Sequence, residues 1–297
     1  MRNRAMVVST FAALAGLSSS FEVGWSEESA AASSSLTASA SGGVLVAPTR
    51  ILFEGRDRTA QLTIVNRADS PALYRIAFVH MRMNAAGGLE PHAEAIAGEA
   101  YADTLVQFSP KQVLLEPGVP QTVRLRLRIP ADLPDGEYRS HLHIRQVPLE
   151  SPGSADASTA ASPAGSGWEV RLRAMVGAAI PVIVRHGATS ASLTVSDLEL
   201  EPSRMEGGPK LVARLHRAGN RSAYGDAIVT YAPKSGSPRV VGAMYGLAVY
   251  TPDSCRTVRI PLSRLPSDGL GVGRLEVVFQ ESARRDAQHA VASLNLP

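Results

Sequence analysis

The sequence predicts an all-β protein built from two β-sandwich domains in tandem. Apolar residues alternate with polar ones in short runs from Val44 onward, and turn-forming residues separate these runs. Many short strands at such spacing are typical of a sandwich of about 100 residues, and a chain of 297 residues has room for two.

The N-terminus has the features of an export signal. Arg2 and Arg4 precede a short apolar stretch at residues 5–17, followed by a stretch rich in serine and alanine. We therefore expect residues 1–43 to be a signal peptide and a disordered leader, with an uncleaved disordered tail as the alternative. Because no run reaches the roughly 20 apolar residues of a membrane-spanning helix, we expect no membrane insertion.

The first domain is expected at residues 44–187. The apolar residues at positions 123, 125, 127 and 129 alternate with arginines at 124, 126 and 128, which predicts a strand with one buried face and one solvated basic face. Shorter runs at residues 60–64 and 74–78 repeat this pattern, and turn signals at 69–71, 116–118 and 134–136 separate the runs. The one plausible helix is an Ala/Glu-rich stretch at residues 93–102.

A second domain is expected at residues 188–297. Residues 149–167 consist almost wholly of Ser, Ala, Gly, Pro and other small or polar residues, which predicts a flexible loop. Trp168 then opens another long strand. After residues 185–187 the alternation restarts with Leu193, Val195 and Leu198, so we place the domain boundary near Gly187.

The strand after this loop has an unusually long alternating face. Its apolar positions are Val170, Leu172, Ala174, Val176, Ala178 and Ile180. From this pattern alone, an ordinary core strand is the favoured interpretation.

Several motifs around this strand resemble the periplasmic pilus chaperones of the chaperone–usher pathway, the PapD-like family. They are residues 48–55 (PTRILFEG), 101–128 with its SPKQV run at 109–113, 133–139 (LPDGEYR) and, more weakly, 220–224 (NRSAY) and 268–279. The resemblance implies two immunoglobulin-like domains, a periplasmic location, and the binding of pilin-like subunits that are passed to an outer-membrane usher.

The resemblance also implies how such subunits would be bound. A pilus subunit is a sandwich that lacks its last strand, so it has an apolar groove and two unpaired strand edges. A donor strand from the chaperone fills the groove with alternating side chains while its backbone pairs with the edges. The expected donor residues are Val170, Leu172, Ala174 and Val176.

The family holds the subunit's C-terminal carboxylate with an arginine and a lysine. Arg50 matches the arginine, because it stands just before the ILF run at residues 51–53. A guanidinium can hold a carboxylate through two parallel hydrogen bonds. The position expected for the lysine is Pro181, which has neither a charge nor a backbone donor, so only Arg50 is expected to be an anchor.

Three further residues match a salt-bridge network that fixes the angle between the two domains in the family. They are Glu137, Arg185 and Asp268. Surface charges without partners are the alternative interpretation.

Other classes of function have little support in the sequence. Nucleophile-elbow, zinc-protease and phosphate-loop motifs are missing, so we expect no enzyme activity and no cofactor. His141 and His143 face the same side of a strand, but without a third ligand they indicate a polar face rather than a metal site. The net charge of +3 and the lack of aromatic residues among the strand arginines argue against nucleic acid. The single cysteine, Cys255, excludes an internal disulfide.

A different class of protein also fits much of this pattern. An exported immunoglobulin-like protein with a structural or adhesive role at the cell surface would share the export signal, the two sandwiches and the loop. Arg50 and the register of the donor strand separate the two hypotheses, because an adhesin needs neither.

Overall fold

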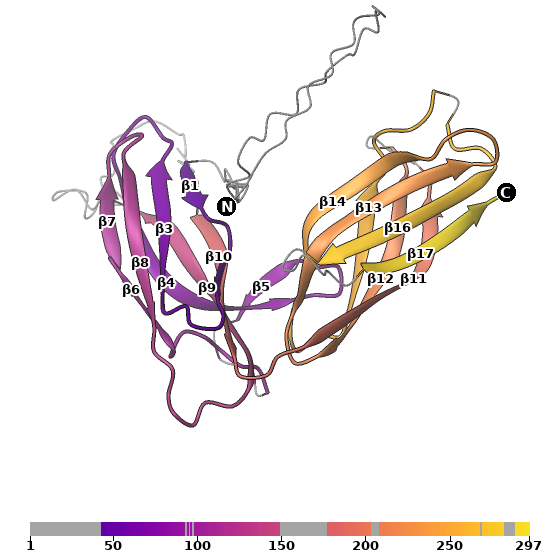
Figure 1. Cartoon of the computed structure of the whole chain (residues 1–297). Helices are drawn as coiled ribbons and strands as arrows, with labels where there is room; N and C mark the ends of the chain where they lie inside the picture. The colour runs from indigo at the N-terminus through magenta and orange to yellow at the C-terminus, as the bar shows by residue number, and fades with distance from the viewer. Residues whose placement is uncertain are drawn as a thin grey trace, which may run out of the picture. The chain divides into compact units, whose positions relative to one another are not determined.

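The structure is a computed structural model, and it describes residues 43–92, 94, 96, 98–148, 177–202, 208–267, 269–281 and 289–297. In these residues the chain forms strands and no helix, so the predicted all-β class is confirmed (Figure 1). Accordingly, the described part of the chain has no helix that is long and apolar enough to span a membrane.

Strands β1 to β10 form the two sheets of the first sandwich. One sheet has the order β1-β3-β8-β6, with β1 (Val44–Ala47), β3 (Thr59–Asn66), β8 (Pro120–Leu127) and β6 (Val106–Ser109). The other has the order β2-β10-β9-β4-β5, and β7 also pairs with β4. Its strands are β2 (Ile51–Phe53), β10 (Gly177–His186), β9 (Gly136–Val147), β4 (Ala72–Met83), β5 (Leu89–His92) and β7 (Gln112–Leu115).

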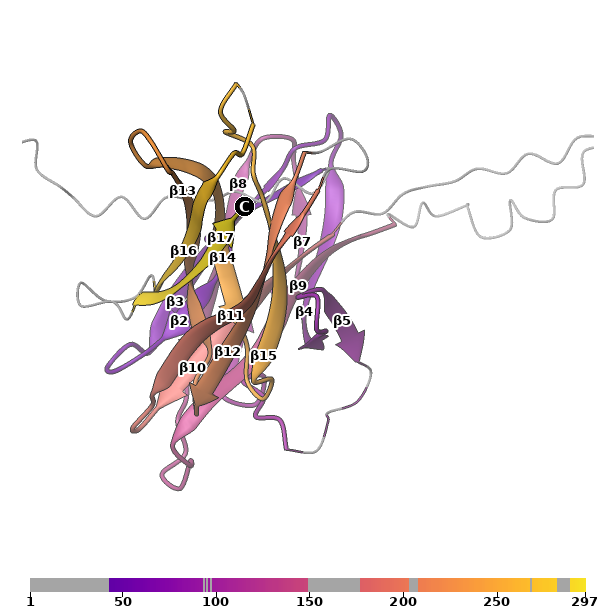
Figure 2. The ribbon, with the colours of Figure 1, turned by 90° about the vertical axis from the view of Figure 1, so that its right-hand side faces the viewer.

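Strands β11 to β17 form the second sandwich. A sheet in the order β11-β12-β15 packs against one in the order β14-β13-β16-β17, as Figure 1 and Figure 2 show from two sides. The strands are β11 (Ala191–Glu201), β12 (Lys210–Gly219), β15 (Cys255–Pro261), β14 (Arg239–Val249), β13 (Ala223–Pro233), β16 (Gly273–Glu281) and β17 (His289–Leu296).

Each sandwich encloses an apolar core. The first core includes Phe53, Leu62, Ile64, Tyr74, Ile76, Leu125, Leu142 and Ile144. The second includes Leu211, Leu215, Val229, Val277 and Phe279, and two residues from strands of the first sandwich, Met83 and Ile183, are buried in it.

Most sequence-predicted elements in the described residues are present, and one is wrong. The arginines at 124, 126 and 128 are exposed while Val123, Leu125 and Leu127 are buried, as the alternation predicts. The helix predicted at residues 93–102 is wrong for the residues that the structure describes there, because 94, 96 and 98–102 form turns and irregular backbone. The predicted loop at residues 149–167 and the leader before Gly43 lie outside the described residues.

The first segment of the chain changes sheets, and this change positions Arg50. β1 pairs with β3 in one sheet, whereas β2, which is separated from β1 by three residues, pairs in parallel with β10 in the other. Pro48 interrupts the strand between them, since a proline cannot donate a backbone hydrogen bond to a neighbouring strand. Arg50 is the residue immediately before β2.

Candidate functional site

Strand β10 has an edge without a partner over half of its described length. On one side it pairs antiparallel with β9 from Gly177 to His186. On the other side β2 pairs with only Val182, Ile183 and Val184. Among the described residues, no strand pairs with the outer edge of residues 177–181, so backbone groups there are available to another chain.

The two faces of β10 have different surroundings. Ala178, Ile180, Val182 and Val184 are buried in the first core, whereas Ala179 on the opposite face is exposed. The inward residues have the same parity as the predicted donor residues Val170, Leu172, Ala174 and Val176, which lie outside the described residues. In residues 177–186, which the structure describes, the apolar face of the strand thus packs into the core of the protein's own first sandwich.

Arg50 lies beside this open edge. Ile51 pairs with Val182, so Arg50 lies next to Pro181 on the neighbouring strand. Its guanidinium stacks on the ring of Tyr224 at 4.1 Å from the ring centroid. Arg50 is partly exposed as a residue, but its Nη1 nitrogen is buried and has no hydrogen-bond acceptor in the described part of the chain. Burial lowers the pKa of Arg50, and the nearby Tyr250 opposes that shift.

His141 is the cross-strand partner of Pro181 and is completely buried. Neither of its ring nitrogens has a hydrogen-bond partner among the residues that the structure describes. Burial, reinforced by the charge of Arg139, lowers the pKa of His141 to about 3. His141 and His143 were expected on a polar face of the strand; both lie on the outer face of β9, but His141 is buried there. His143 is half-buried and lies against Gly177, so that a side chain in place of this glycine would contact His143 Nε2.

Tyr250, which follows β14, contacts two residues of β9. The Arg139 guanidinium stacks on its ring at 4.3 Å, and the His141 ring meets it edge-on at a centroid distance of 6.5 Å. Arg139 also donates to the backbone oxygens of Met81 at 3.2 Å and Thr251 at 3.3 Å, although its Nε is buried without an acceptor. Basic side chains of the first sandwich thus meet two tyrosines of the second.

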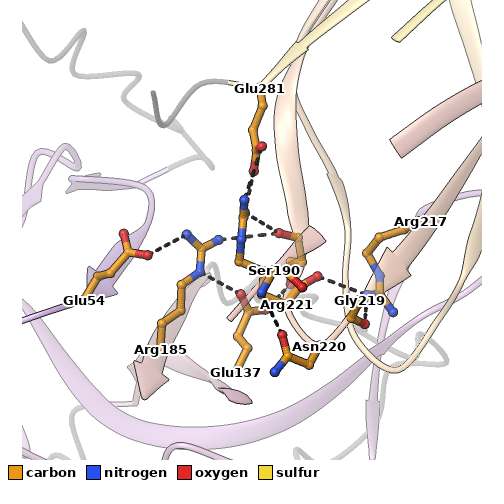
Figure 3. Close-up of polar contacts among 10 residues, drawn as sticks. Glu54, Glu137, Arg185, Ser190, Arg217, Gly219, Asn220, Arg221 and Glu281 are labelled. Carbon is orange, nitrogen blue, oxygen red and sulfur yellow. Dashed lines mark hydrogen bonds and ion pairs between the residues drawn. The ribbon is translucent and has the colours of Figure 1, made fainter. Parts of the chain in front are cut away.

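The structure brings Glu137 and Arg185 together (Figure 3). Arg185 Nε donates to Glu137 Oε2 at 3.0 Å, and both side chains are buried. Arg185 also donates to the backbone oxygen of Ser222 at 3.4 Å and to Glu54 at 3.5 Å. The Ser222 hydroxyl donates to the second oxygen of Glu137. Both residues of this pair belong to the first sandwich, and their contacts with Ser222 link it to the second.

The second sandwich contributes residues to this network that sequence reasoning did not assign. Asp268, which was expected there, lies outside the described residues. Ser222 contacts Glu137, and its neighbour Arg221 forms a buried ion pair with Glu281 (Figure 3). The motif at residues 220–224 was the available signal, since it contains both Arg221 and Ser222.

The described part of the chain contains no group of three or more His, Cys, Asp or Glu side chains that could hold a metal ion. Cys255 is a free, half-buried thiol at the start of β15.

No protein-family model matches the chain, and no curated protein matches it. The chain is similar to solved structures of pilus chaperones, at low sequence identity. The YadV chaperone is 12% identical with a TM-score of 0.43, covering 86% of this chain and 100% of that chain. The CsuC–CsuE chaperone–tip adhesion subunit pre-assembly complex from Csu pili of Acinetobacter baumannii is 12% identical with a TM-score of 0.43, covering 84% and 98%. The Salmonella enterica SafA pilin in complex with the SafB chaperone is 15% identical with a TM-score of 0.40, covering 85% and 96%.

Proposed function

We propose that this protein is a periplasmic chaperone of the chaperone–usher type. It binds pilin-like subunits by donor-strand complementation and delivers them to an outer-membrane usher. The observation that carries the proposal is the position of Arg50, whose buried Nη1 lacks an acceptor beside the unpaired edge of β10. An open strand edge next to an unpaired cation suits a ligand that is itself a strand ending in a carboxylate.

The open edge supplies the backbone half of the interaction. Residues 177–180 offer amide and carbonyl groups to the last strand of a subunit, whereas Pro181 offers no amide. In this proposal Val170, Leu172, Ala174 and Val176 continue the strand and enter the subunit's groove. Burial of each Val or Leu side chain stabilises the complex by about 1.5–3 kcal/mol.

Arg50 supplies the charged half. A guanidinium that stacks on an aromatic ring is held in one orientation, which lowers the entropic cost of binding a carboxylate. The acceptor that Nη1 lacks in the free protein is then an oxygen of the subunit's C-terminus. Because the group is buried, its loss should weaken binding by about 2–5 kcal/mol.

The remaining parts of the chain fit this role as further proposals. The charged and apolar N-terminal regions would direct export to the periplasm. A boundary near Gly187 would separate the domains, and the Glu137–Arg185 pair with Ser222 would fix their orientation.

A binding experiment with a denatured pilin-type subunit tests the proposal. The subunit is refolded with wild type or Arg50→Ala, and with either a free or an amidated C-terminus. Wild type should stabilise the free-carboxylate subunit best, and Arg50→Ala should lose that preference. Arg124→Ala, an exposed arginine of β8, is the matched control and should bind like wild type. Absence of any binding would favour the exported structural or adhesive protein, and equal affinities in all combinations would refute the anchor.

A further inference from the structure

Four residues lie in one row across the outer face of the sheet: Arg50, Pro181, His141 and Val79. Arg50 is level with Pro181 because Ile51 pairs with Val182. Pro181 pairs with His141, and His141 pairs with Val79. Since neighbouring strands are about 4.8 Å apart, the Cα atoms of Arg50 and His141 are about 10 Å apart, with Pro181 between them.

Arg50 and His141, on either side of Pro181 in this row, both carry nitrogen atoms without partners among the described residues. Among the described residues, buried Arg50 Nη1 has no acceptor, and neither the donor nor the acceptor nitrogen of the buried His141 ring has a partner. A buried polar group without a partner costs about 1–3 kcal/mol, and most native structures contain few of them. A group with two adjacent acceptor oxygens suits this arrangement.

We infer that His141 is the second ligand of the carboxylate site. It supplies the donor that a lysine at position 181 would supply and that Pro181 lacks. One oxygen of the partner's terminal carboxylate accepts from Arg50 and the other accepts from the N–H of His141, with the carboxylate above Pro181. The inference rests on the proposed function, because it names a group within the same site.

The chemistry of His141 suits this role without a second positive charge. A neutral imidazole carries one N–H donor, and its low pKa keeps it neutral in the free protein. The carboxylate is then balanced by Arg50, while Arg139 is already bonded to two backbone oxygens. The hydrogen bond from His141 is charge-assisted because its acceptor is ionised.

The row is accessible from one end. Arg50 and Pro181 are partly exposed, whereas His141 is covered and its ring meets Tyr250 edge-on. The carboxylate therefore approaches over Arg50 and Pro181, and the imidazole turns toward Pro181 to meet it.

The test uses a defined probe and two variants of one row. The probe is a short N-acetylated peptide of alternating threonine and valine, prepared with a free carboxylate and as its C-terminal amide. Calorimetric titration gives the affinity ratio of the two peptides. His141→Phe keeps a ring of similar size and should lower the ratio about tenfold or more, as expected for a lost hydrogen bond to a charged group. His143→Phe is the control and should leave the ratio unchanged, because His143 lies two residues along β9 on the same face and pairs with Ala179 instead of Pro181.

A rescue variant makes the assignment specific. Adding Pro181→Lys to His141→Phe restores a second donor to the row and should recover the ratio. Added to wild type, Pro181→Lys should change the ratio little, because His141 already fills the position. If His141→Phe does not fold, Pro181→Lys in the wild-type background alone tests the inference.

The outcomes separate this inference from the proposed function. If wild type does not prefer the free carboxylate, carboxylate capture itself is refuted. If wild type prefers it and Arg50→Ala abolishes the preference, but His141→Phe retains it, only the role of His141 is overturned. A large gain from Pro181→Lys in wild type would also overturn it, since the second position would then be vacant.

Discussion

Arg50 and Arg139 are both buried against tyrosine rings, yet they differ in what satisfies them. Arg139 donates to the backbone oxygens of Met81 and Thr251, so the fold itself holds its charge in place. Among the described residues, each side chain keeps one buried nitrogen without a partner, Nη1 in Arg50 and Nε in Arg139. Nη1 and Nη2 of Arg139 are bonded to the backbone, so we assign Arg139 a structural role. Arg50 lies beside the open edge of β10, so we propose a binding role for it.

The buried imidazole of His141 makes stability depend on pH. Its pKa is about 3 in the folded protein against an ordinary 6.5. Between these values the unfolded chain binds a proton that the folded chain does not, so stability is lost as the pH falls through this window. The loss is at most about 1.4 kcal/mol per pH unit. Urea unfolding at about pH 7 and about pH 5 should show a smaller acid-induced loss for His141→Phe than for wild type. An unchanged loss would contradict a buried neutral His141.

The Glu137–Arg185 pair should be sensitive to removal of either charge. Glu137→Gln removes the buried counter-ion of Arg185 and leaves only the half-exposed Glu54, 3.5 Å from Nη1, to balance the guanidinium, which should lower the free energy of unfolding by about 3 kcal/mol. The exposed pair between Arg259 and Glu201 is the control, and Arg259→Gln should cost less than about 1 kcal/mol. Urea unfolding measures both. Equal losses in the free energy of unfolding would show that the buried pair stabilises the protein no more than the exposed pair does.

Some of these residues could be recognised from the sequence and others could not. Arg50 and Pro181 could be placed because each stands at a fixed distance from an apolar run that forms a strand. The alternation in β9 shows that Leu142 faces the core and that His141 faces outward. It contains no sign that Tyr250, more than 100 residues later, covers that outward face. Burial on the second side of a sheet depends on tertiary contacts that local periodicity does not encode.

At the scale of elements, strand β10 is divided into two halves. Val182, Ile183 and Val184 have neighbouring strands on both sides, whereas residues 177–181 pair with β9 alone among the described strands. The unpaired half is kept in place by Ala178 and Ile180, which are buried in the first core. The strand is thus anchored by its inner face while its edge remains available.

Hydrogen exchange should distinguish the two halves of β10. In the free protein, amides on the outer edge of residues 177–180 should exchange much faster than those of residues 182–184, because they lack a partner strand. When a strand-forming subunit binds, the fast amides should become protected. Exchange measured by NMR before and after binding checks both statements. Strong protection in the free protein would mean that this edge is already occupied.

Local sequence patterns predicted one of two irregular segments correctly, the strand β11, and failed for the stretch at 93–102. In β11 the apolar positions 193, 195 and 198 depart from strict alternation, and the structure explains this by a bulge at Asp197, whose φ is +51°. The Ala/Glu-rich stretch at 93–102 follows helix propensity, but its described residues do not form a helix. Propensity is a weak guide in a short segment between strands, because nucleation of an isolated helical turn is unfavourable.

At the scale of the whole molecule, the core of the second sandwich is completed by the first. Met83 at the end of β4 and Ile183 in β10 are both buried among residues of the second core. The turn after β4 adds a backbone hydrogen bond, in which Thr257 donates to Ala85 at 3.0 Å. These contacts, together with the Glu137–Arg185 pair, couple the stability of the two sandwiches.

This coupling predicts a single cooperative unfolding transition that depends on Met83. Replacing this buried side chain by a charge in Met83→Asp leaves an unpaired carboxylate in an apolar core, which the protein can avoid only by separating the β4–β5 hairpin from the second sandwich. Scanning calorimetry of wild type should show one transition, and Met83→Asp should show two, with the second sandwich melting first. Leu89→Asp, in the partly exposed β5 of the same hairpin, is the control and should keep one transition. One transition at an unchanged temperature in Met83→Asp would mean that the two sandwiches are held together by the polar contacts alone.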